Sequence, residues 1–119
     1  MPPDAALPPT ELPPDWPAAL AGRLADPGPR ELPLDGNRAS AVLIAFLHRP
    51  TGPTLLLVRK SERLNNHAGQ VGFPGGSADP TDSDLQATAL REAWEEVGLS
   101  PERVQILGRL DDERTYVTS

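Results

Sequence analysis

The hydrophobic residues of this chain gather in short runs from residue 40 onward. Residues 41–47 read AVLIAFL, and a short apolar run with β-branched members predicts a buried strand. Residues 54–58, TLLLV, predict a second strand. The segment 50–53, PTGP, indicates a turn, so we expect the two strands to form a hairpin.

A helical pattern of apolar positions follows over residues 83–97. At about 100° per residue, these positions cover a continuous arc of roughly half the helix circumference. The arc contains Leu85, Ala89, Leu90, Ala93, Trp94 and Val97. Ser83 followed by Gln86 is typical of a capping box, and Gly98 is typical of a helix end. We expect the arc to pack on a sheet, with Trp94 in the core.

Two further segments complete the pattern. Residues 59–76 are polar and loop-like, and residues 104–110 predict another strand. A strand pair, a loop, a helix and a strand in this order indicate an α/β or an α+β fold.

The first third of the chain differs in composition. Ten of the fifteen prolines lie within the first 33 residues, and proline removes a backbone donor and fixes φ. Residues 15–25 predict one short helix, with Asp15 as its N-cap. We therefore expect residues 1–38 to form a proline-rich N-terminal arm with one short helix, and residues 39–119 to form the domain.

Composition and charge exclude several classes of function. The 119 residues contain no cysteine, which excludes a disulfide scaffold, a thiolate metal site and a cysteine nucleophile. A net charge of -6 argues against nonspecific binding of nucleic acid or an anionic membrane. No segment approaches the roughly 20 apolar residues of a membrane helix, and the N-terminus lacks the pattern of a signal peptide. We expect a cytoplasmic protein.

Three carboxylates share one side of the predicted helix. Glu92, Glu95 and Glu96 fall within about one turn, and like charges at this spacing destabilise a helix by about 0.2–0.5 kcal/mol per pair. The helix dipole also disfavours negative charge near the C-terminus, and Arg91 is the nearest cation. Clustered carboxylates suit Mg²⁺ or Mn²⁺. The alternative is a solvated acidic face with Arg91 as a surface ion pair.

A glycine-rich segment precedes this helix. Residues 69–76 read GQVGFPGG, and Gly75 and Gly76 would let the backbone approach a ligand closely or turn sharply. A double glycine alone indicates no more than a tight turn. A carboxylate helix that begins seven residues later favours a binding site.

Residues 91–99, REAWEEVGL, match every specified position in the core of the Nudix box, R-E-U-x-E-E-x-G-U with U apolar. With one residue inserted, Gly76 and Asp82 take the places of the upstream glycine and glutamate of the box. The chain therefore resembles the Nudix hydrolases over about residues 39–115. The shift is typical of the coenzyme A pyrophosphatase branch, which carries Gly-Gly-x-x-Asp-x-x-Asp before the helix, as residues 75–82 do.

An upstream motif of the same branch, L-L-T-x-R-[SA]-x3-R-x3-G-x3-F-P-G-G, aligns without gaps over residues 56–76. Three positions depart from it. Val58 replaces threonine, and Lys60 and Asn65 replace the two arginines. Lysine keeps the charge but loses bidentate geometry toward phosphate, and asparagine loses the charge.

The resemblance implies an α/β/α sandwich around a mixed sheet. That fold has further strands and a second long helix, which we expect to be missing beyond Ser119. It also implies hydrolysis of a diphosphate with Mg²⁺, or Mn²⁺, held by Glu92, Glu95 and Glu96. Glu95 and Glu96 are the leading ligand candidates, and Glu92 is a ligand or a base. Arg91 would pair with a glutamate and orient it.

The expected substrate is coenzyme A, cleaved to 3′,5′-ADP and 4′-phosphopantetheine. Candidate substrate contacts are Arg59, Lys60, Arg63 and His67, with Gly75 and Gly76 shaping the loop beside the metal. Ordinary surface charge is the alternative for the three cations, and a structural role is the alternative for the histidine. Two other functions stay open: a Nudix hydrolase of ADP-ribose or NADH, and a non-catalytic binding module. We expect no nucleic-acid partner and no membrane partner, with a homodimer as an open alternative to a monomer.

Overall fold

The computed structural model describes residues 13–59 and 69–115 of the chain. Three predicted substrate contacts, Lys60, Arg63 and His67, and the departure at Asn65 lie outside the described residues. The described residues divide into two compact units. Residues 13–32 and 106–115 form the first unit, and residues 33–59 and 69–105 form the second.

The first unit contains helix α1, Trp16–Ala25, which confirms the helix predicted over residues 15–25. Asp15 occupies the N-cap position, but its side chain makes no capping hydrogen bond. Residues 106–115 complete the unit. The backbone N–H of Arg30 donates to Asp111 Oδ1 at 2.7 Å, and the N–H of Leu32 donates to Asp112 Oδ2 at 3.0 Å. This segment is therefore held by carboxylates bonded to backbone.

The strand predicted over residues 104–110 is wrong. The 3₁₀-helix η1, Pro101–Arg103, is followed by irregular backbone, and no described strand pairs with residues 104–110. A strand needs a hydrogen-bonded neighbour, and an apolar pattern alone does not supply one.

The second unit is built from three antiparallel strand pairs. The strands are β1 Ser40–Val42, β2 Phe46–Leu47, β3 Thr54–Leu55, β4 Val58–Arg59, β5 Val71–Gly72 and β6 Gly75–Ser77. The pairs are β1 with β6, β2 with β3, and β4 with β5. The pairing of Phe46 with Leu55 confirms the predicted hairpin. The α/β class is also confirmed, and neither described helix has the length and apolar character to cross a bilayer.

The apolar run 41–47 divides into two short strands that are covered on one face only. Ala41, Leu43 and Ala45 are half-buried, whereas Val42 and Ile44 are 58% and 38% exposed. Burial thus alternates with the period of two that a strand imposes on its side chains. The prediction of a buried strand holds for one face and is wrong for the other.

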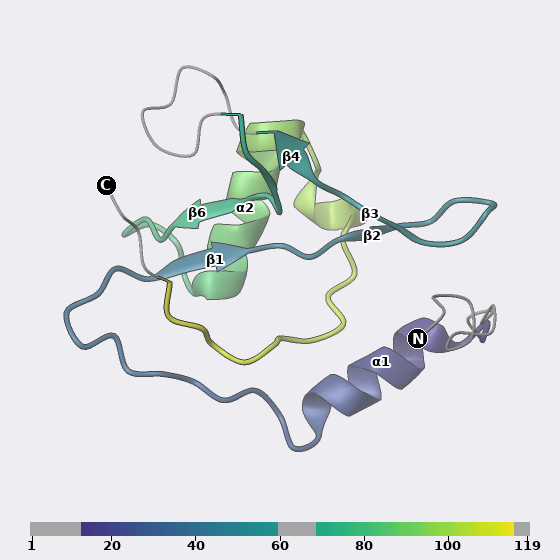
Figure 1. Ribbon diagram of the computed structural model, residues 1–119, viewed down its shortest axis with the longest axis horizontal. Coiled ribbons are helices and arrows are strands. Elements are labelled where there is room, and N and C mark those ends of the chain that lie inside the picture. Colours follow the sequence, from purple (N-terminus) through teal and green to yellow (C-terminus); the bar gives the residue numbers. More distant parts are fainter. Residues whose placement is uncertain (1–12, 60–68, 116–119) are drawn as a thin grey trace, which may run out of the picture. The chain divides into compact units, whose positions relative to one another are not determined.

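Helix α2, Leu85–Val97, packs against β1 and β6 and covers their inner face (Figure 1). Its N-cap is Asp84, whose Oδ1 accepts from the Ala87 N–H at 2.8 Å, so the capping box predicted at Ser83 is wrong by one residue. The helix ends at Gly98, as predicted, with φ of 70° in the left-handed region.

The buried face of α2 is a narrow stripe of small side chains. Thr88, Ala89 and Ala93 are 0%, 6% and 0% exposed. Trp94 is 55% exposed, so its predicted place in the core is wrong. Small residues facing a glycine-containing strand allow close approach of the two backbones. Of the wider side chains of the arc, Trp94 and Val97 are exposed, whereas Leu85 and Leu90 are half-buried.

Candidate active site

Arg91 is the centre of the polar contacts on α2. Its Nε and Nη2 donate to Asp82 Oδ1 and Oδ2 at 2.9 and 3.1 Å, a bidentate pair. Nη2 also donates to the Ser77 carbonyl at 3.1 Å, and Nη1 lies 3.2 Å from both Glu92 Oε1 and Glu95 Oε2. One guanidinium therefore connects the loop before the helix, strand β6 and two predicted metal ligands.

Asp82 holds this guanidinium in place. Its side chain is only 7% exposed. The hydrogen bond from Arg91, followed by the donors at the Asp79 backbone and Thr88, holds the pKa of Asp82 well below its ordinary value. The same pairing raises the pKa of Arg91 above its already high value. Both groups are therefore charged at neutral pH.

Gly75 and Gly76 lie in strand β6, which corrects their predicted place in a loop. A Cβ atom on Gly76 would lie 2.6 Å from the Glu92 carboxylate, and one on Gly75 would meet the backbone of Ala41 and Val42. Because Gly75 has no side chain, strand β1 can lie close to it. For the same reason, the carboxylate of Glu92 can lie close to Gly76. The close neighbours of this pair are therefore β1 and α2 of the same chain, and the close approach of a ligand stays a prediction.

The three predicted metal ligands differ in environment. Glu92 is 18% exposed and Glu95 is 54% exposed. Glu96 is half-buried, and its Oε2 atom is shielded from solvent. The three carboxylates of α2 therefore differ in their exposure to solvent. A uniformly solvated acidic face would expose all three.

Within residues 13–59 and 69–115, no group of three or more Asp, Glu and His side chains is arranged to hold a metal ion. Two of the predicted ligands, Glu92 and Glu95, instead share contacts with Nη1 of Arg91. The donor chemistry still fits a divalent cation, since carboxylate oxygens are the ligands that Mg²⁺ and Mn²⁺ prefer.

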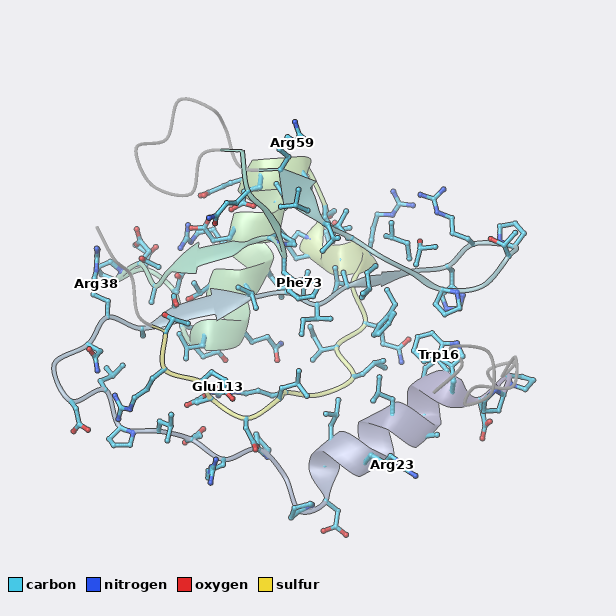
Figure 2. All side chains as sticks on the ribbon, in the orientation of Figure 1. Trp16, Arg23, Arg38, Arg59, Phe73 and Glu113 are labelled. Carbon is cyan, nitrogen blue, oxygen red and sulfur yellow. The ribbon has the colours of Figure 1, made fainter. Side chains whose placement is uncertain are left out.

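Of the four predicted substrate-binding side chains, only Arg59 lies among the described residues. It is the last residue of β4, it is exposed, and Figure 2 shows its side chain directed outward. Within the described part of the chain it forms no ion pair. The structure thus brings Gly76, Arg91, Glu92 and Glu95 together, and Arg59 stays outside this cluster.

Two residues next to this cluster, Asp82 and Thr88, make contacts that the helical and strand patterns alone do not predict. Asp82 is indicated only by the resemblance to the Nudix hydrolases. An aspartate shortly before a helix that contains an arginine is a sequence signal that could indicate such an ion pair. The apolar arc predicted for α2 does not include Thr88, whose hydroxyl donates to Asp82 Oδ2 at 2.8 Å. The signal for Thr88 is a hydroxyl among the small apolar positions of the helix.

A separate hollow lies in the first unit. Its volume is about 630 Å³, and its charged lining consists of Arg23, Arg30, Arg109, Asp111 and Glu113. Arg109 is already paired with Asp112 at 2.8 Å. Charges of both signs line the hollow, and it contains none of the predicted site residues.

Comparison with known proteins gives consistent matches. A NUDIX domain profile matches residues 37–119. The chain is 55% identical over 84 residues to a Photorhabdus laumondii protein, 56% over 78 residues to one from Pectobacterium atrosepticum and 57% over 74 residues to one from Yersinia pestis. Each of these relatives is named an uncharacterized Nudix hydrolase, NudL.

The matched regions cover 71%, 66% and 62% of this chain, in the same order. They cover 44%, 40% and 37% of the three relatives, so the chain spans less than half of their length. The profile match includes all six strands and α2 with its carboxylates. On this match, and on identities above half with three relatives, the chain belongs to the Nudix hydrolase family.

Proposed function

We propose that this chain carries the metal-binding part of a hydrolase that cleaves the diphosphate of coenzyme A or its derivatives. The products would be 3′,5′-ADP and 4′-phosphopantetheine. The observation that supports the site most directly is the placement of Glu92 and Glu95 on one guanidinium, with Gly76 beside Glu92. The substrate class rests on the sequence motif over residues 56–76.

Glu95 and Glu96 are the proposed metal ligands, and Glu92 is a third ligand or the base. A bound Mg²⁺ or Mn²⁺ would neutralise charge on the diphosphate and lower the pKa of an attacking water. Arg91 orients the carboxylates of Glu92 and Glu95 through its Nη1. Gly76 leaves the space that the Glu92 carboxylate occupies.

Arg59, Lys60, Arg63 and His67 are the proposed contacts for the phosphates of the substrate. The exposed position of Arg59 is compatible with this role, because a phosphate could reach its side chain from solvent. We also propose that the protein acts in the cytoplasm on a small molecule. A homodimer is the assembly to test against a monomer.

A second candidate is a Nudix hydrolase of another nucleoside diphosphate, such as ADP-ribose or NADH. The observation that favours it is Asn65, which stands where the coenzyme A branch carries an arginine. A non-catalytic binding module is the third candidate. The full set of Glu92, Glu95 and Glu96 speaks against it, because binding alone does not need three metal ligands.

Substrate choice is tested by assaying the full-length protein with Mg²⁺ against coenzyme A, ADP-ribose and NADH. Release of 3′,5′-ADP from coenzyme A, with little turnover of the other two, supports the first candidate. Preference for ADP-ribose or NADH overturns it in favour of the second. No turnover of any substrate, with a Glu96→Gln variant that binds ligands like wild type, favours the binding module.

The metal site is tested by Glu96→Gln in the full-length protein. Loss of residues that only support a metal ligand costs about 10–100-fold, so loss of a ligand should lower turnover by about 100-fold or more. Glu102→Gln makes the same change in η1, where Glu102 accepts a hydrogen bond from Ser100, and should leave turnover unchanged. Near-normal turnover of Glu96→Gln would show that α2 is not the metal site.

A further inference from the structure

Thr88 is a fully buried polar residue near the start of α2, at the end of its first turn. A buried hydroxyl needs a hydrogen-bond partner, and threonine is a poorer helix former than the alanines beside it on the same face. Its Oγ1 lies 2.8 Å from Asp82 Oδ2 and 3.2 Å from the Asp84 carbonyl. The nearer acceptor is also the charged one, so it is the stronger partner.

Asp82 receives this hydroxyl together with a second donor on the same oxygen. The Asp79 backbone N–H donates to Oδ2 at 2.9 Å. With Oδ2 held by Thr88 and Asp79, the carboxylate is fixed with both oxygens toward Nε and Nη2 of Arg91. Thr88 and Asp79 therefore orient Asp82, and they contact it on the side of Arg91 that lies away from the glutamates.

Arg91 carries this orientation to the opposite side of its guanidinium. The group is planar, so fixing Nε and Nη2 also fixes the direction of Nη1. Nη1 is the atom that donates to Glu92 and Glu95. A continuous series of hydrogen bonds thus runs from Thr88 through Asp82 and Arg91 to two proposed metal ligands.

We propose that Thr88 is a positioning residue whose hydroxyl orients Asp82 and, through Arg91, the carboxylates of Glu92 and Glu95. Thr88 itself touches neither metal nor substrate. The consequence for metal binding rests on the proposed function, whereas the effect on Arg91 does not. If Thr88 only filled space under the helix, its methyl group would matter and its hydroxyl would not.

Two substitutions in the 119-residue chain separate the hydroxyl from the methyl group. Thr88→Val keeps the shape and removes the hydroxyl, and Thr88→Ser keeps the hydroxyl and removes the methyl. Thr81→Val is the matched control, because Thr81 is exposed and its hydroxyl donates to Asp79 at 2.7 Å, not to Asp82. The probe is Mn²⁺ alone, with its affinity measured by titration calorimetry.

Thr88→Val should weaken Mn²⁺ binding by about tenfold, the lower end of the effect of residues that support metal ligands. Thr88→Ser should stay within about twofold of wild type even if its melting temperature falls, and Thr81→Val should match wild type. Equal losses of Mn²⁺ affinity in Thr88→Val and Thr88→Ser would overturn the proposal.

A second readout does not depend on the metal. In the metal-free chain, the Nε–H of Arg91 should give a slowly exchanging NMR resonance, because it donates to the nearly buried Asp82 at 2.9 Å. Thr88→Val should shift this resonance and speed its exchange with water, and Thr88→Ser should not. An unchanged resonance in Thr88→Val overturns the positioning role. If wild type binds no Mn²⁺, the metal site fails, and the Nε–H resonance still decides whether Thr88 acts on Arg91.

Discussion

Single residues explain why an unfavourable cluster of charge persists on α2. Three glutamates within one turn repel one another and lie at the end of the helix where the dipole disfavours them. Arg91 offsets part of this repulsion by donating to Glu92 and Glu95. Since Glu95 is 54% exposed, its ion pair contributes little to the free energy of folding, and its main effect is orientation.

The Gly76→Ala substitution should damage the site more than the fold. The new Cβ would lie 2.6 Å from Cδ and Oε1 of Glu92, which form the movable end of a flexible side chain. The carboxylate should therefore swing away at small cost in stability, while Mn²⁺ affinity falls by about tenfold or more. Calorimetric titration and thermal unfolding of the same sample measure both effects.

Two neighbouring glycines serve as controls for this prediction. Gly72→Ala introduces a Cβ with nothing within 4 Å and should change neither property. Gly75→Ala places its Cβ 2.7 Å from the Val42 Cα, so it should lower the melting temperature. Wild-type Mn²⁺ affinity in Gly76→Ala would show that the Glu92 carboxylate does not contribute to metal binding.

At the scale of elements, α2 is fixed at both ends and along one narrow stripe. Asp84 caps its start, Gly98 ends it, and Thr88, Ala89 and Ala93 lie against β1 and β6. Asp82 ties the loop before the helix to Arg91, which lies in the second turn of α2. The position of the helix on the strands and the position of Arg91 therefore depend on each other.

The free energy of unfolding should decrease as pH is lowered, because of the ionised Asp82. Its pKa is held well below the ordinary value of 3.8, chiefly by Arg91. A lowered pKa in the folded state adds stability above the unfolded pKa, and this stability is lost as pH falls below it. The free energy of unfolding in urea should therefore decrease as pH is lowered from about 5 to about 3.

Asp82→Asn provides the comparison across the same pH range. It should be less stable than wild type at neutral pH. The difference should narrow as pH falls, because Asp82 of the unfolded chain takes up a proton near the ordinary pKa of 3.8, which favours unfolding, while Asp82 of the folded chain stays charged. A difference that stays constant with pH would mean that the Asp82 pKa is not lowered by folding.

At the scale of the whole molecule, the second unit has one covered face and one exposed apolar face. The exposed apolar face consists of Val42, Ile44, Phe46, Leu55 and Leu57, which are 58%, 38%, 41%, 48% and 51% exposed. The register of β2 and β3 sets Phe46 directly opposite Leu55. Exposed apolar side chains that gather on neighbouring strands can bind partners or promote aggregation.

Ile44→Thr in the 119-residue chain should reduce binding of a hydrophobic dye and raise solubility. Threonine retains strand propensity, and a substitution on an exposed face should change the free energy of unfolding by only about 0.5 kcal/mol. Leu43→Thr, on the covered face, should cost about 1–3 kcal/mol. Equal destabilisation by the two substitutions would show that Ile44 is covered in solution.

The sequence determined the features that depend on spacing along the chain. Helices α1 and α2, the hairpin of β2 and β3, and the stop at Gly98 follow from local periodicity and turn residues. The Nudix family is also contained in the sequence, because the box is one contiguous stretch. The carboxylates were predictable for the same reason, since helical periodicity alone places Glu92, Glu95 and Glu96 together.

The tertiary structure decided which surfaces and side chains meet. The continuous apolar run 41–47 could not reveal that only one face is covered, and the apolar arc could not place Trp94 outside the core. Residues 104–110 have the pattern of a strand but no described strand beside them. The bond from Thr88 to Asp82 likewise depends on how the preceding loop folds onto α2. Each of these outcomes depends on residues distant in the sequence that pack against the segment in question. The helix and its charged side, in contrast, follow from local periodicity alone.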